Sequence, residues 1–375
     1  MNPSRNGLPP PRVCIIILNW NGWQDTIECL ESIRRSDYPD CCTVVVDNGS
    51  RDDSCKRIQA WAEENKAAGP RAGDNLIGGE SLRVILYERA AAESRRSGEN
   101  GRELPMSPAA SRLALIQVGE NRGFAGGSNI GIRYAQAVGS EFVWLLNNDT
   151  VVEKAALGRM VYFLESHSDF QGVTGQIRLH GDPSRIWHCG GTLTCFGTRR
   201  YHYLNSPSAR VPQRGFKRIS YITCCAAVFR VSLFKKVGLL SERFFFGEED
   251  FELSQRLKPS KFKLACLYDA IVYHKVGKSI DKVIRRENLP KSYIYYLNRF
   301  IDMRHYWRRF PWQLWRFSYF FYIFPLLKLR HGVSWNDFRS FRRQLIKDST
   351  DLDGVSKATF ERLLRFNFGE DAPRT

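Results

Sequence analysis

The 375-residue sequence lacks several features that would place it in familiar classes of protein. None of its ten cysteines forms a Cys-x-x-Cys pair, and the cysteines fall in predicted strands and helices. This pattern argues against a zinc site and a disulfide framework, and it suits a reduced, cytoplasmic compartment. The first 12 residues are polar and proline-rich, and the apolar run that follows is too short for a signal peptide, so we expect none.

Acidic residues are scarce relative to basic ones. The chain has 56 Lys and Arg against 39 Asp and Glu, a formal net charge of +17. Such an excess favours anionic partners: nucleic acid, nucleotide phosphates or an acidic membrane surface. The hydrophobic content of 43% is enough to bury a large core, as one domain or as one domain with an appendage.

An apolar run long enough to span a membrane is also missing from the aromatic C-terminal segment. Between residues 290 and 347 the longest uncharged run has 11 residues, whereas a spanning helix needs roughly 20. The segment carries twelve Lys and Arg against two acids, interleaved with many aromatic residues. Cations and aromatics together are typical of helices in a membrane interface, although helices packed on the preceding domain would explain them too. We predict that residues 281–375 are helical and bind an anionic membrane surface, and that the preceding domain folds without them.

The stretch from residue 141 to 150 organises the rest of the prediction. Residues 142–146 form an unbroken apolar run, which is typical of a strand buried on both faces of an α/β sheet. The run ends at Asn147, Asn148 and Asp149, at the edge of the sheet where such folds bind ligands. A carboxylate beside amides suits a hard divalent cation that also holds phosphate oxygens. A polar turn without a ligand explains the same residues equally well.

Predicted strands and helices alternate along the chain, which indicates a parallel sheet with right-handed crossovers. The predicted strands are residues 13–18, 43–46, 113–118, 142–146, 172–179, 186–193, 219–229 and 264–273. Thr150 is predicted to cap a helix whose core stripe includes Ala156, Leu157 and Met160. Residues 66–111 are rich in Ala, Gly, Ser, Arg and Glu, and we predict a partly mobile surface insertion with one strand at 82–87.

A glycine-rich turn at residues 119–129 leads into a helix. Free backbone N–H groups at a helix N-terminus can bind an anion, although glycine that only lets the chain turn is the alternative. The spacing is not G-x-G-x-x-G, which argues against a nicotinamide-binding fold.

Four acids follow three phenylalanines shortly before a later helix: Glu248, Glu249, Asp250 and Glu252. They could simply complement the helix dipole. Next to the phenylalanines they would be partly desolvated, which raises the pKa of a carboxyl group and suits it to act as a base. His274 ends the next predicted strand, and this position after an acidic cluster favours a ligand role over a structural one.

These segments, in this order, resemble the family 2 glycosyltransferases of the GT-A fold, especially the bacterial rhamnosyltransferase-like enzymes that build surface polysaccharide. The matching stretches are residues 15–22, 44–50, 121–131, 145–150 and 244–253. The resemblance implies a GT-A (Rossmann-like) α/β domain at residues 13–280, with a mostly parallel sheet flanked by helices. A flexible N-terminus, residues 1–12, would precede it and the basic aromatic helical region would follow.

The resemblance also implies a set of donor-binding residues: Trp20, Asp47, Asn48, Asn121, Arg122, Asn129, Asn147, Asn148 and Asp149. Trp20 is expected to stack on the nucleobase, and Asp47 to hydrogen-bond it. Asn121, Arg122 and Asn129 are expected to line the nucleotide and the diphosphate.

The implied metal site consists of Asp149 and His274, with Mg²⁺ or Mn²⁺ as the cation. Asp149 matches the last acid of the family's D-x-D motif, whose first position is Asn147 in this sequence. His274 matches a histidine that completes the metal shell in some members of the family.

The implied catalytic base is Asp250, which follows Glu in the family's E-D motif, and Glu249 is the alternative because three acids in a row allow two registers. Inversion at an anomeric carbon needs only one base, which takes the proton of the acceptor hydroxyl. The expected donor is a nucleotide-diphosphate sugar, such as dTDP-rhamnose or a UDP-sugar. The expected acceptor is a glycan or a lipid-linked molecule, at the cytoplasmic face of the inner membrane.

Two other functions remain open from the residues alone. The basic aromatic segment is compatible with a nucleic-acid-binding protein, but no recognised nucleic-acid module is present, so we expect no nucleic acid partner. A nucleotidyltransferase could use a similar sheet, but it would need a glycine-rich loop directly after the first strand, where this chain has Asn19, Trp20 and Asn21.

Overall fold

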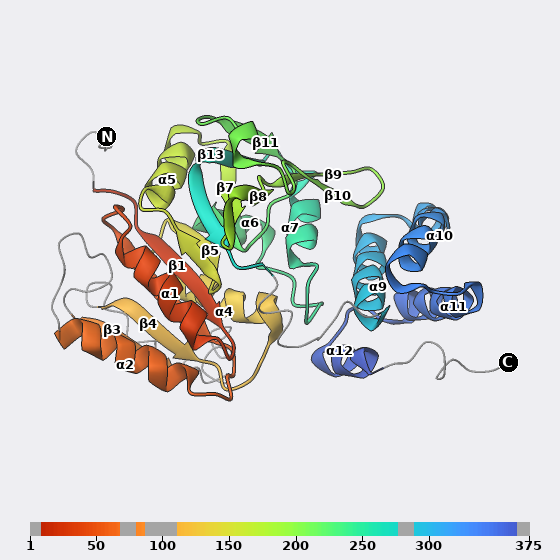
Figure 1. The fold of residues 1–375 in the computed structure, drawn as a ribbon, viewed down its shortest axis with the longest axis horizontal. Helices are drawn as coiled ribbons and strands as arrows, with labels where there is room; N and C mark the ends of the chain where they lie inside the picture. Colours follow the sequence, from red (N-terminus) through yellow and green to blue (C-terminus); the bar gives the residue numbers. More distant parts are fainter. Residues whose placement is uncertain (1–8, 68–79, 87–110, 277–288, 366–375) are drawn as a thin grey trace.

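The computed structural model describes residues 9–67, 80–86, 111–276 and 289–365 (Figure 1). The strands in these ranges are β1 (Val13–Asn19), β2 (Cys41–Asp47), β3 (Glu80–Leu86), β4 (Ser111–Gln117), β5 (Phe142–Asn147), β6 (Thr150–Val152), β7 (Phe170–Leu179), β8 (Asp182–His188), β9 (Gly191–Leu193), β10 (Arg199–Tyr201), β11 (Phe216–Ile219), β12 (Ala226–Arg230) and β13 (Lys263–His274). The helices of four or more residues are α1 (Trp23–Arg34), α2 (Ser54–Ala67), α4 (Gly123–Ala137), α5 (Ala156–Ser166), α6 (Val231–Val237), α7 (Glu249–Leu257), α9 (Leu289–Tyr306), α10 (Arg309–His331), α11 (Trp335–Asp351) and α12 (Lys357–Leu364).

One large sheet forms the centre of the molecule. Within the described residues its strand order is β11-β13-β7-β12-β5-β1-β2-β4-β3, with β6 and β8 paired to β13 and β7. Strands β5, β1, β2, β4 and β3 are all parallel, and β12 enters antiparallel between β5 and β7. The predicted α/β fold, with a mostly parallel sheet flanked by helices, is confirmed.

The apolar runs of the sequence form strands that are buried on both faces. In β1, Ile15 and Ile17 belong to one hydrophobic cluster, while Cys14 and Ile16 belong to the other. This alternation follows from the two-residue period of a strand, and burying each large aliphatic side chain stabilises the fold by about 1.5–3 kcal/mol. Helices α1, α2 and α5 cover the first face, and α4, α6 and α7 cover the second (Figure 1).

The prediction that Thr150 caps a helix is wrong. Thr150 begins the short strand β6, which pairs antiparallel with β13 so that Thr150 lies opposite His274. The Thr150 hydroxyl donates to the carbonyl oxygen of Asn147 at 2.6 Å, and the N-cap residue of α5 is Ala155, which accepts no hydrogen bond through its side chain. The helix, α5, begins only at Ala156, and its predicted core stripe is buried. Pairing with a strand from far along the chain outweighs the local capping pattern.

The predicted strand at residues 219–229 is a strand only from Ala226 onward, in β12, and Ile219 is the last residue of β11 in another part of the sheet. Strand β11 pairs with β13, whereas β12 pairs with β5 and β7. Because these neighbours are different, the strand structure is interrupted between Ile219 and Ala226. The predicted strand at 186–193 is likewise divided between β8 and β9. The strand predicted at 82–87 is β3, which pairs parallel with β4 at the edge of the main sheet. Residues 68–79 and 87–110 of the predicted insertion lie outside the described residues.

Between residues 289 and 365 the C-terminal region is helical, as its basic aromatic composition predicted, and Figure 1 places it at one side of the sheet. Its buried aromatic residues, among them Tyr293, Phe300 and Trp315, share a hydrophobic cluster with Phe244 and Phe251 of the α/β part. Many aromatics of this segment are therefore core residues. The shared cluster argues against the expectation that the preceding domain folds without these helices. No helix in the described part of the chain combines the length and hydropathy needed to cross a membrane.

Candidate functional site

The carboxyl ends of the parallel strands carry polar side chains that bind one another. Asn19 lies beside Asp47 in the register of β1 and β2, and Asn147 ends the neighbouring strand β5. The buried Asp47 carboxylate accepts hydrogen bonds from Asn19 Nδ2 (2.7 Å), Ser50 Oγ (2.6 Å) and the Ser50 backbone N–H (3.1 Å). The Cys55 thiol also hydrogen-bonds Asp47, so contact of this carboxylate with a nucleobase stays a prediction. Trp20 is partly exposed immediately after β1.

The glycine-rich turn is tied to this edge through Asn48. Its Nδ2 donates to Asn121 Oδ1 (3.1 Å) and to the carbonyl oxygen of Gly123 (3.0 Å), and its Oδ1 accepts from the Arg122 backbone N–H (3.0 Å). Gly123 has a φ of +73°, and a Cβ there would lie 2.2 Å from the carbonyl oxygen of Phe245. Only glycine fits this position, so the turn contacts the loop that precedes α7.

Two of the predicted donor-binding asparagines make internal hydrogen bonds. Asn129 donates to the Leu240 carbonyl oxygen (2.9 Å) and to Glu242 Oε1 (2.8 Å), and it accepts from the Leu240 N–H (3.0 Å). Asn148 donates to Thr26 Oγ1 at 3.1 Å, which joins the end of β5 to α1. Both side chains hold segments of the site together, and direct contact with a nucleotide stays a prediction for each.

Asp149 and His274 meet although 125 residues separate them. The pairing of β6 with β13 brings them together, and Lys275 N–H donates to the Asp149 carbonyl oxygen at 2.9 Å. Both side chains are buried, and Asp149 Oδ1 lies at a hydrogen-bond distance of 3.0 Å from His274 Nε2, so the two side chains are close enough to contact one cation. The described residues place no third His, Cys, Asp or Glu in this group. One carboxylate and one imidazole fit Mg²⁺ or Mn²⁺ whose other ligands are phosphate oxygens and water. Asn147, at the first position of the D-x-D motif, ends β5 and supplies no carboxylate to this candidate metal site.

Asp250 lies in the first turn of α7, and its carboxylate accepts hydrogen bonds from residues 221–224. Its Oδ1 accepts from the Cys224 backbone N–H (2.8 Å), and its Oδ2 accepts from Thr223 Oγ1 (3.0 Å) and Tyr221 Oη (3.4 Å). These bonds orient the carboxylate, and Asp250 stays partly exposed, so an acceptor hydroxyl can reach it as a base requires.

The segment 223–225, which donates to Asp250, also contacts the end of β5. The Asn147 N–H donates to the Cys225 carbonyl oxygen at 2.8 Å. Burial raises the pKa of the Cys225 thiol well above its ordinary value, and the charges of Asp250 and Asp149 raise it further. Through Cys224 and Cys225, this segment links the candidate base to the end of β5, two residues before the candidate metal ligand Asp149.

Glu249 has different surroundings from Asp250. Its Oε2 is buried without a hydrogen-bond partner in the described part of the chain. Burial and then the neighbouring charge of Asp250 raise the pKa of Glu249 to about 8. The prediction that the acidic run is partly desolvated is confirmed for this residue.

A row of aromatic rings connects the two halves of the site, and the sequence prediction missed it. The Trp187 ring lies 4.6 Å from the His274 ring and 4.4 Å from the His188 ring, centroid to centroid. His188 stacks on Tyr201 at 4.7 Å, and Tyr201 packs edge-on against Tyr221, a donor to Asp250. The available signal was the run Trp-His-Cys-Gly-Gly at residues 187–191, a histidine at a strand end before two glycines.

The His188 ring in this row is neutral and carries its proton on Nε2. The Gly190 N–H donates to its Nδ1 at 3.1 Å, so the ring proton is on Nε2. Burial, followed by the charges of His274 and Arg199, lowers the pKa of His188 to about 3. Its Nε2 is buried without a hydrogen-bond partner among the described residues.

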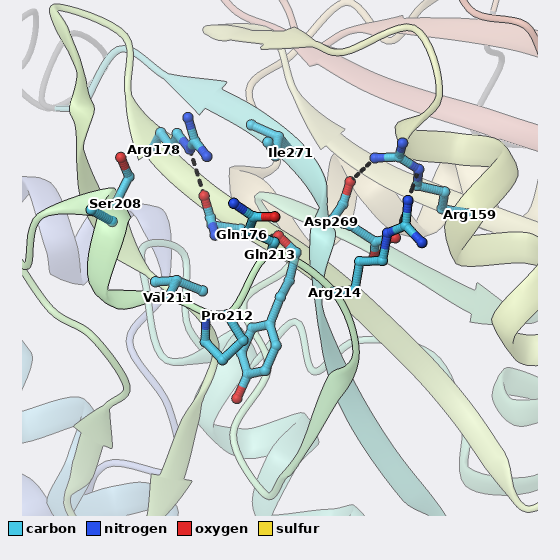
Figure 2. Close-up of a pocket in the computed structure, with 12 residues that line it drawn as sticks. Arg159, Gln176, Arg178, Ser208, Val211, Pro212, Gln213, Arg214, Asp269 and Ile271 are labelled. Carbon is cyan, nitrogen blue, oxygen red and sulfur yellow. Dashed lines mark hydrogen bonds and ion pairs between the residues drawn. The ribbon is translucent and has the colours of Figure 1, made fainter.

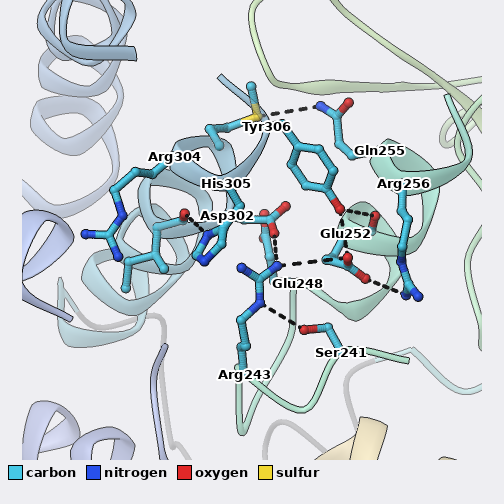
Figure 3. Close-up of polar contacts among 12 residues, drawn as sticks. Ser241, Arg243, Glu248, Glu252, Gln255, Arg256, Asp302, Arg304, His305 and Tyr306 are labelled. Carbon is cyan, nitrogen blue, oxygen red and sulfur yellow. Dashed lines mark hydrogen bonds and ion pairs between the residues drawn. The ribbon is translucent and has the colours of Figure 1, made fainter. Parts of the chain in front are cut away.

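Helix α9 fixes the loop before α7. Glu248 has a left-handed backbone conformation (φ +73°), and its buried carboxylate pairs with the buried guanidinium of Arg299. Close by, Arg243 pairs with Asp302 at 3.1 Å, and Tyr306 Oη donates to Glu252 Oε1 at 2.7 Å (Figure 3). These contacts set the position of the turn that carries Glu249 and Asp250.

A pocket of about 480 Å³ lies elsewhere on the molecule. It is lined by β7 and β13 and by the loop that precedes β11, and Arg178, Arg214 and Asp269 are among its residues (Figure 2). None of the predicted site residues lines it.

Two family models match the chain. Residues 14–71 match the model described as glycosyl transferase family 2, and residues 102–288 match the one described as glycosyltransferase like family 2. The chain belongs to glycosyltransferase family 2. This confirms the resemblance to family 2 drawn from the motifs, and the two matched ranges contain Trp20, Asp149, Asp250 and His274.

Several known proteins are similar to this family member. The low-salt glycan biosynthesis hexosyltransferase Agl10 of Haloferax volcanii is 25% identical over 191 residues, which are 50% of this chain and 59% of that protein. Mannosyltransferase PcManGT from Pyrobaculum calidifontis, solved with GDP-Man and Mn²⁺, has 15% identity and a TM-score of 0.46, covering 91% of this chain and 87% of that one. TarS 1–349 of S. aureus has 15% identity and a TM-score of 0.43, covering 96% and 98%.

Proposed function

We propose that this protein is an inverting glycosyltransferase that moves a sugar from a nucleotide-diphosphate sugar to the hydroxyl group of a glycan or lipid-linked acceptor. One observation supports the proposal: the segment 223–225 donates to Asp250 through the Cys224 N–H and accepts from the N–H of Asn147, two residues before the Asp149 that meets His274. Membership of family 2 supports glycosyl transfer as the reaction. A dTDP-sugar such as dTDP-rhamnose and a UDP-sugar are the candidate donors.

The donor nucleotide is proposed to lie along the carboxyl ends of β1 and β2. Trp20 offers an aromatic face to the base, and Asp47, which Asn19 and Ser50 hold beside it, is the proposed hydrogen-bond partner of the base. The N-terminus of α4 is proposed to face a phosphate with the backbone N–H groups that follow Gly123, whose own N–H donates to Asn121 Oδ1 at 2.9 Å. The partly exposed Arg122 adds a cation beside it.

Asp149 and His274 are proposed to hold Mg²⁺ or Mn²⁺ on the diphosphate. When bound, such a cation stabilises the negative charge that develops on the departing diphosphate. Trp187 packs against the His274 ring and restricts its orientation, while His188 stays neutral and adds no charge that would repel a cation.

Asp250 is proposed to act at the acceptor hydroxyl. As the acceptor oxygen bonds to the anomeric carbon, the bond from that carbon to the diphosphate oxygen breaks and the hydroxyl proton passes to Asp250. A single displacement of this kind inverts the anomeric configuration. It requires no nucleophile from the enzyme.

A nucleotide-sugar screen tests the proposal. Purified protein is heated with each donor, with and without Mn²⁺ or Mg²⁺, and its melting temperature is measured. The correct donor should raise the melting temperature only with the cation, because its diphosphate is proposed to bind through the cation. A ligand at 100 times its Kd stabilises the folded state by about 2.7 kcal/mol. The same donor should release its nucleoside diphosphate when the acceptor is added. If no nucleotide sugar stabilises the protein or is turned over, the proposed function is wrong.

A further inference from the structure

Helix α10 presents an apolar face to solvent. Phe310, Phe321 and Leu329 are 75%, 72% and 85% exposed, and Leu314 and Phe317 are also exposed. Their spacing of three, four or eight residues places them on one side of the helix. Between Arg309 and Lys328, the exposed residues of α10 carry no charge.

This face is not needed to complete the core of the protein. The opposite side of α10, including Trp312, Trp315 and Ile323, is buried in the cluster that it shares with α9 and α11. The one cation within this stretch, Arg316, turns inward, stacks on Trp312 and donates to the Ile346 carbonyl oxygen. A contiguous exposed apolar face on a well-packed helix marks an interaction surface.

Exposed cations lie at both ends of the apolar face. Exposed Arg308 and Arg309 lie at the start of α10, and exposed Lys328 and Arg330 lie near its end. The exposed Arg339, Arg343 and Lys347 follow on α11, where Arg339 stacks on the half-exposed Trp335.

This arrangement fits an anionic bilayer better than a second copy of the chain. Apolar and aromatic side chains enter the boundary between headgroups and acyl chains, while flanking cations bind anionic headgroups. In a two-fold dimer through this face, the cationic rims of the two copies would face each other. Like charges in that position repel, so self-association is disfavoured.

We propose that α10 docks this protein on an anionic membrane surface, with its axis in the plane of the interface. Phe310, Leu314, Phe317 and Phe321 enter the bilayer, and the cations at both ends of α10 bind the headgroups. This proposal stands independently of the glycosyl transfer reaction. Helix α9 packs against α10 and holds the loop before α7, so a docked α10 keeps the candidate base close to the membrane-bound part of the molecule (Figure 1).

Vesicle sedimentation tests the apolar face. The full chain is mixed at low salt with vesicles of phosphatidylcholine alone, or of phosphatidylcholine with phosphatidylglycerol. We expect strong binding to the anionic vesicles, and a loss of at least about tenfold in the double variant Phe317→Glu/Phe321→Glu, because burial of two phenyl rings is lost. The matched control is Tyr162→Glu/Leu204→Glu, which charges two exposed apolar residues outside α10 and should bind like the unmodified protein. Phe317→Trp should also retain binding. Circular dichroism confirms that each variant is folded.

The cationic rim has its own test. Lys328→Glu/Arg330→Glu should weaken binding to anionic vesicles by roughly fivefold for each cation removed, and high salt should have a similar effect on the unmodified protein. Failure of the full chain to bind anionic vesicles at low salt would overturn the proposal, as would equal binding by the Phe317→Glu/Phe321→Glu variant. Sedimentation equilibrium showing a dimer that this variant dissociates, without vesicle binding, would identify the face as a contact between copies instead.

Discussion

At the scale of single residues, the two neighbouring carboxylates Glu249 and Asp250 differ in what surrounds them. Asp250 is oriented by three donors, whereas one oxygen of Glu249 is buried without a partner in the described part of the chain. Orientation is what proton transfer from a bound hydroxyl requires, because the base must lie within hydrogen-bond reach of the proton. The geometry therefore favours Asp250 as the base.

Asp250→Asn should lower the rate of the chemical step by roughly a hundredfold or more, because an amide cannot accept the proton. Donor binding should survive, since the nucleotide is proposed to bind at Asp47 and Asp149. Single-turnover kinetics and calorimetry separate the two effects.

Glu249→Gln is the matched control and should lose far less activity. A greater loss in this variant would assign the base to Glu249. In that case activity would fall as the pH drops below about 8, because the carboxyl group would take up its proton there.

Asp149→Ala should abolish the cation dependence of nucleoside diphosphate binding, because the anionic ligand of the cation is removed. His274→Ala should weaken the same dependence less, as it removes a neutral ligand. Calorimetric titration at several Mn²⁺ concentrations measures both. An unchanged metal dependence in Asp149→Ala would contradict the assignment, and an unchanged titration in His274→Ala would make His274 a structural residue.

At the scale of elements, the packing of α9 against the loop before α7 sets the position of the candidate base. Arg299 and Glu248 are both buried, and the Arg299 guanidinium also lies over the Phe251 ring at 3.3 Å. Arg299→Met should lower the free energy of unfolding by about 3–5 kcal/mol, because it leaves the Glu248 charge buried and unpaired. Urea unfolding measures this change. The double variant Arg299→Met/Glu248→Gln should recover part of the loss, and no recovery would show that the pair does not set the stability.

Asp302 on α9 should make stability depend on pH. Burial, followed by the charges of Glu248 and Glu252, raises its pKa from 3.8 to about 8. Between these pH values the folded state binds more protons than the unfolded state, so the free energy of unfolding falls as the pH rises. In Asp302→Asn this contribution is absent, and its stability should fall less between pH 4 and 8.

Urea unfolding at several pH values checks the Asp302 prediction. Asp353→Asn, at a side chain 82% exposed, is the control and should follow the unmodified protein. Parallel curves for Asp302→Asn and the unmodified protein would show that Asp302 is ionised in the folded state.

At the scale of the whole molecule, the C-terminal helices and the α/β part share one hydrophobic cluster. A chain truncated after residue 288 would expose Phe244 and Phe251 and leave Glu248 without its partner. We therefore expect it to unfold at a lower temperature than the full chain, or to aggregate. Calorimetry and size-exclusion chromatography measure this outcome. A monomeric truncated protein with an unchanged melting temperature would show that the two parts fold independently.

The sequence by itself determined the local features of this protein. Buried strands are encoded by contiguous apolar runs, and polar residues at their ends mark the edge where Asn19, Asp47 and Asn147 lie. The glycine turn, the acidic run and the order of the motifs were sufficient to identify the family. These properties depend on neighbours in the chain, and a pattern of residue types records them.

Only the tertiary structure decided which distant residues meet and which aromatics are exposed. Thr150 matched a helix cap locally, but β13 supplied backbone partners that make it a strand and bring His274 to Asp149. Composition could not separate the core aromatics of α10 from its exposed ones, because both kinds alternate along the same helix. Which side of α10 is buried depends on where α9 and α11 pack. The free energy for this packing comes from contacts between distant segments rather than from local helix preference.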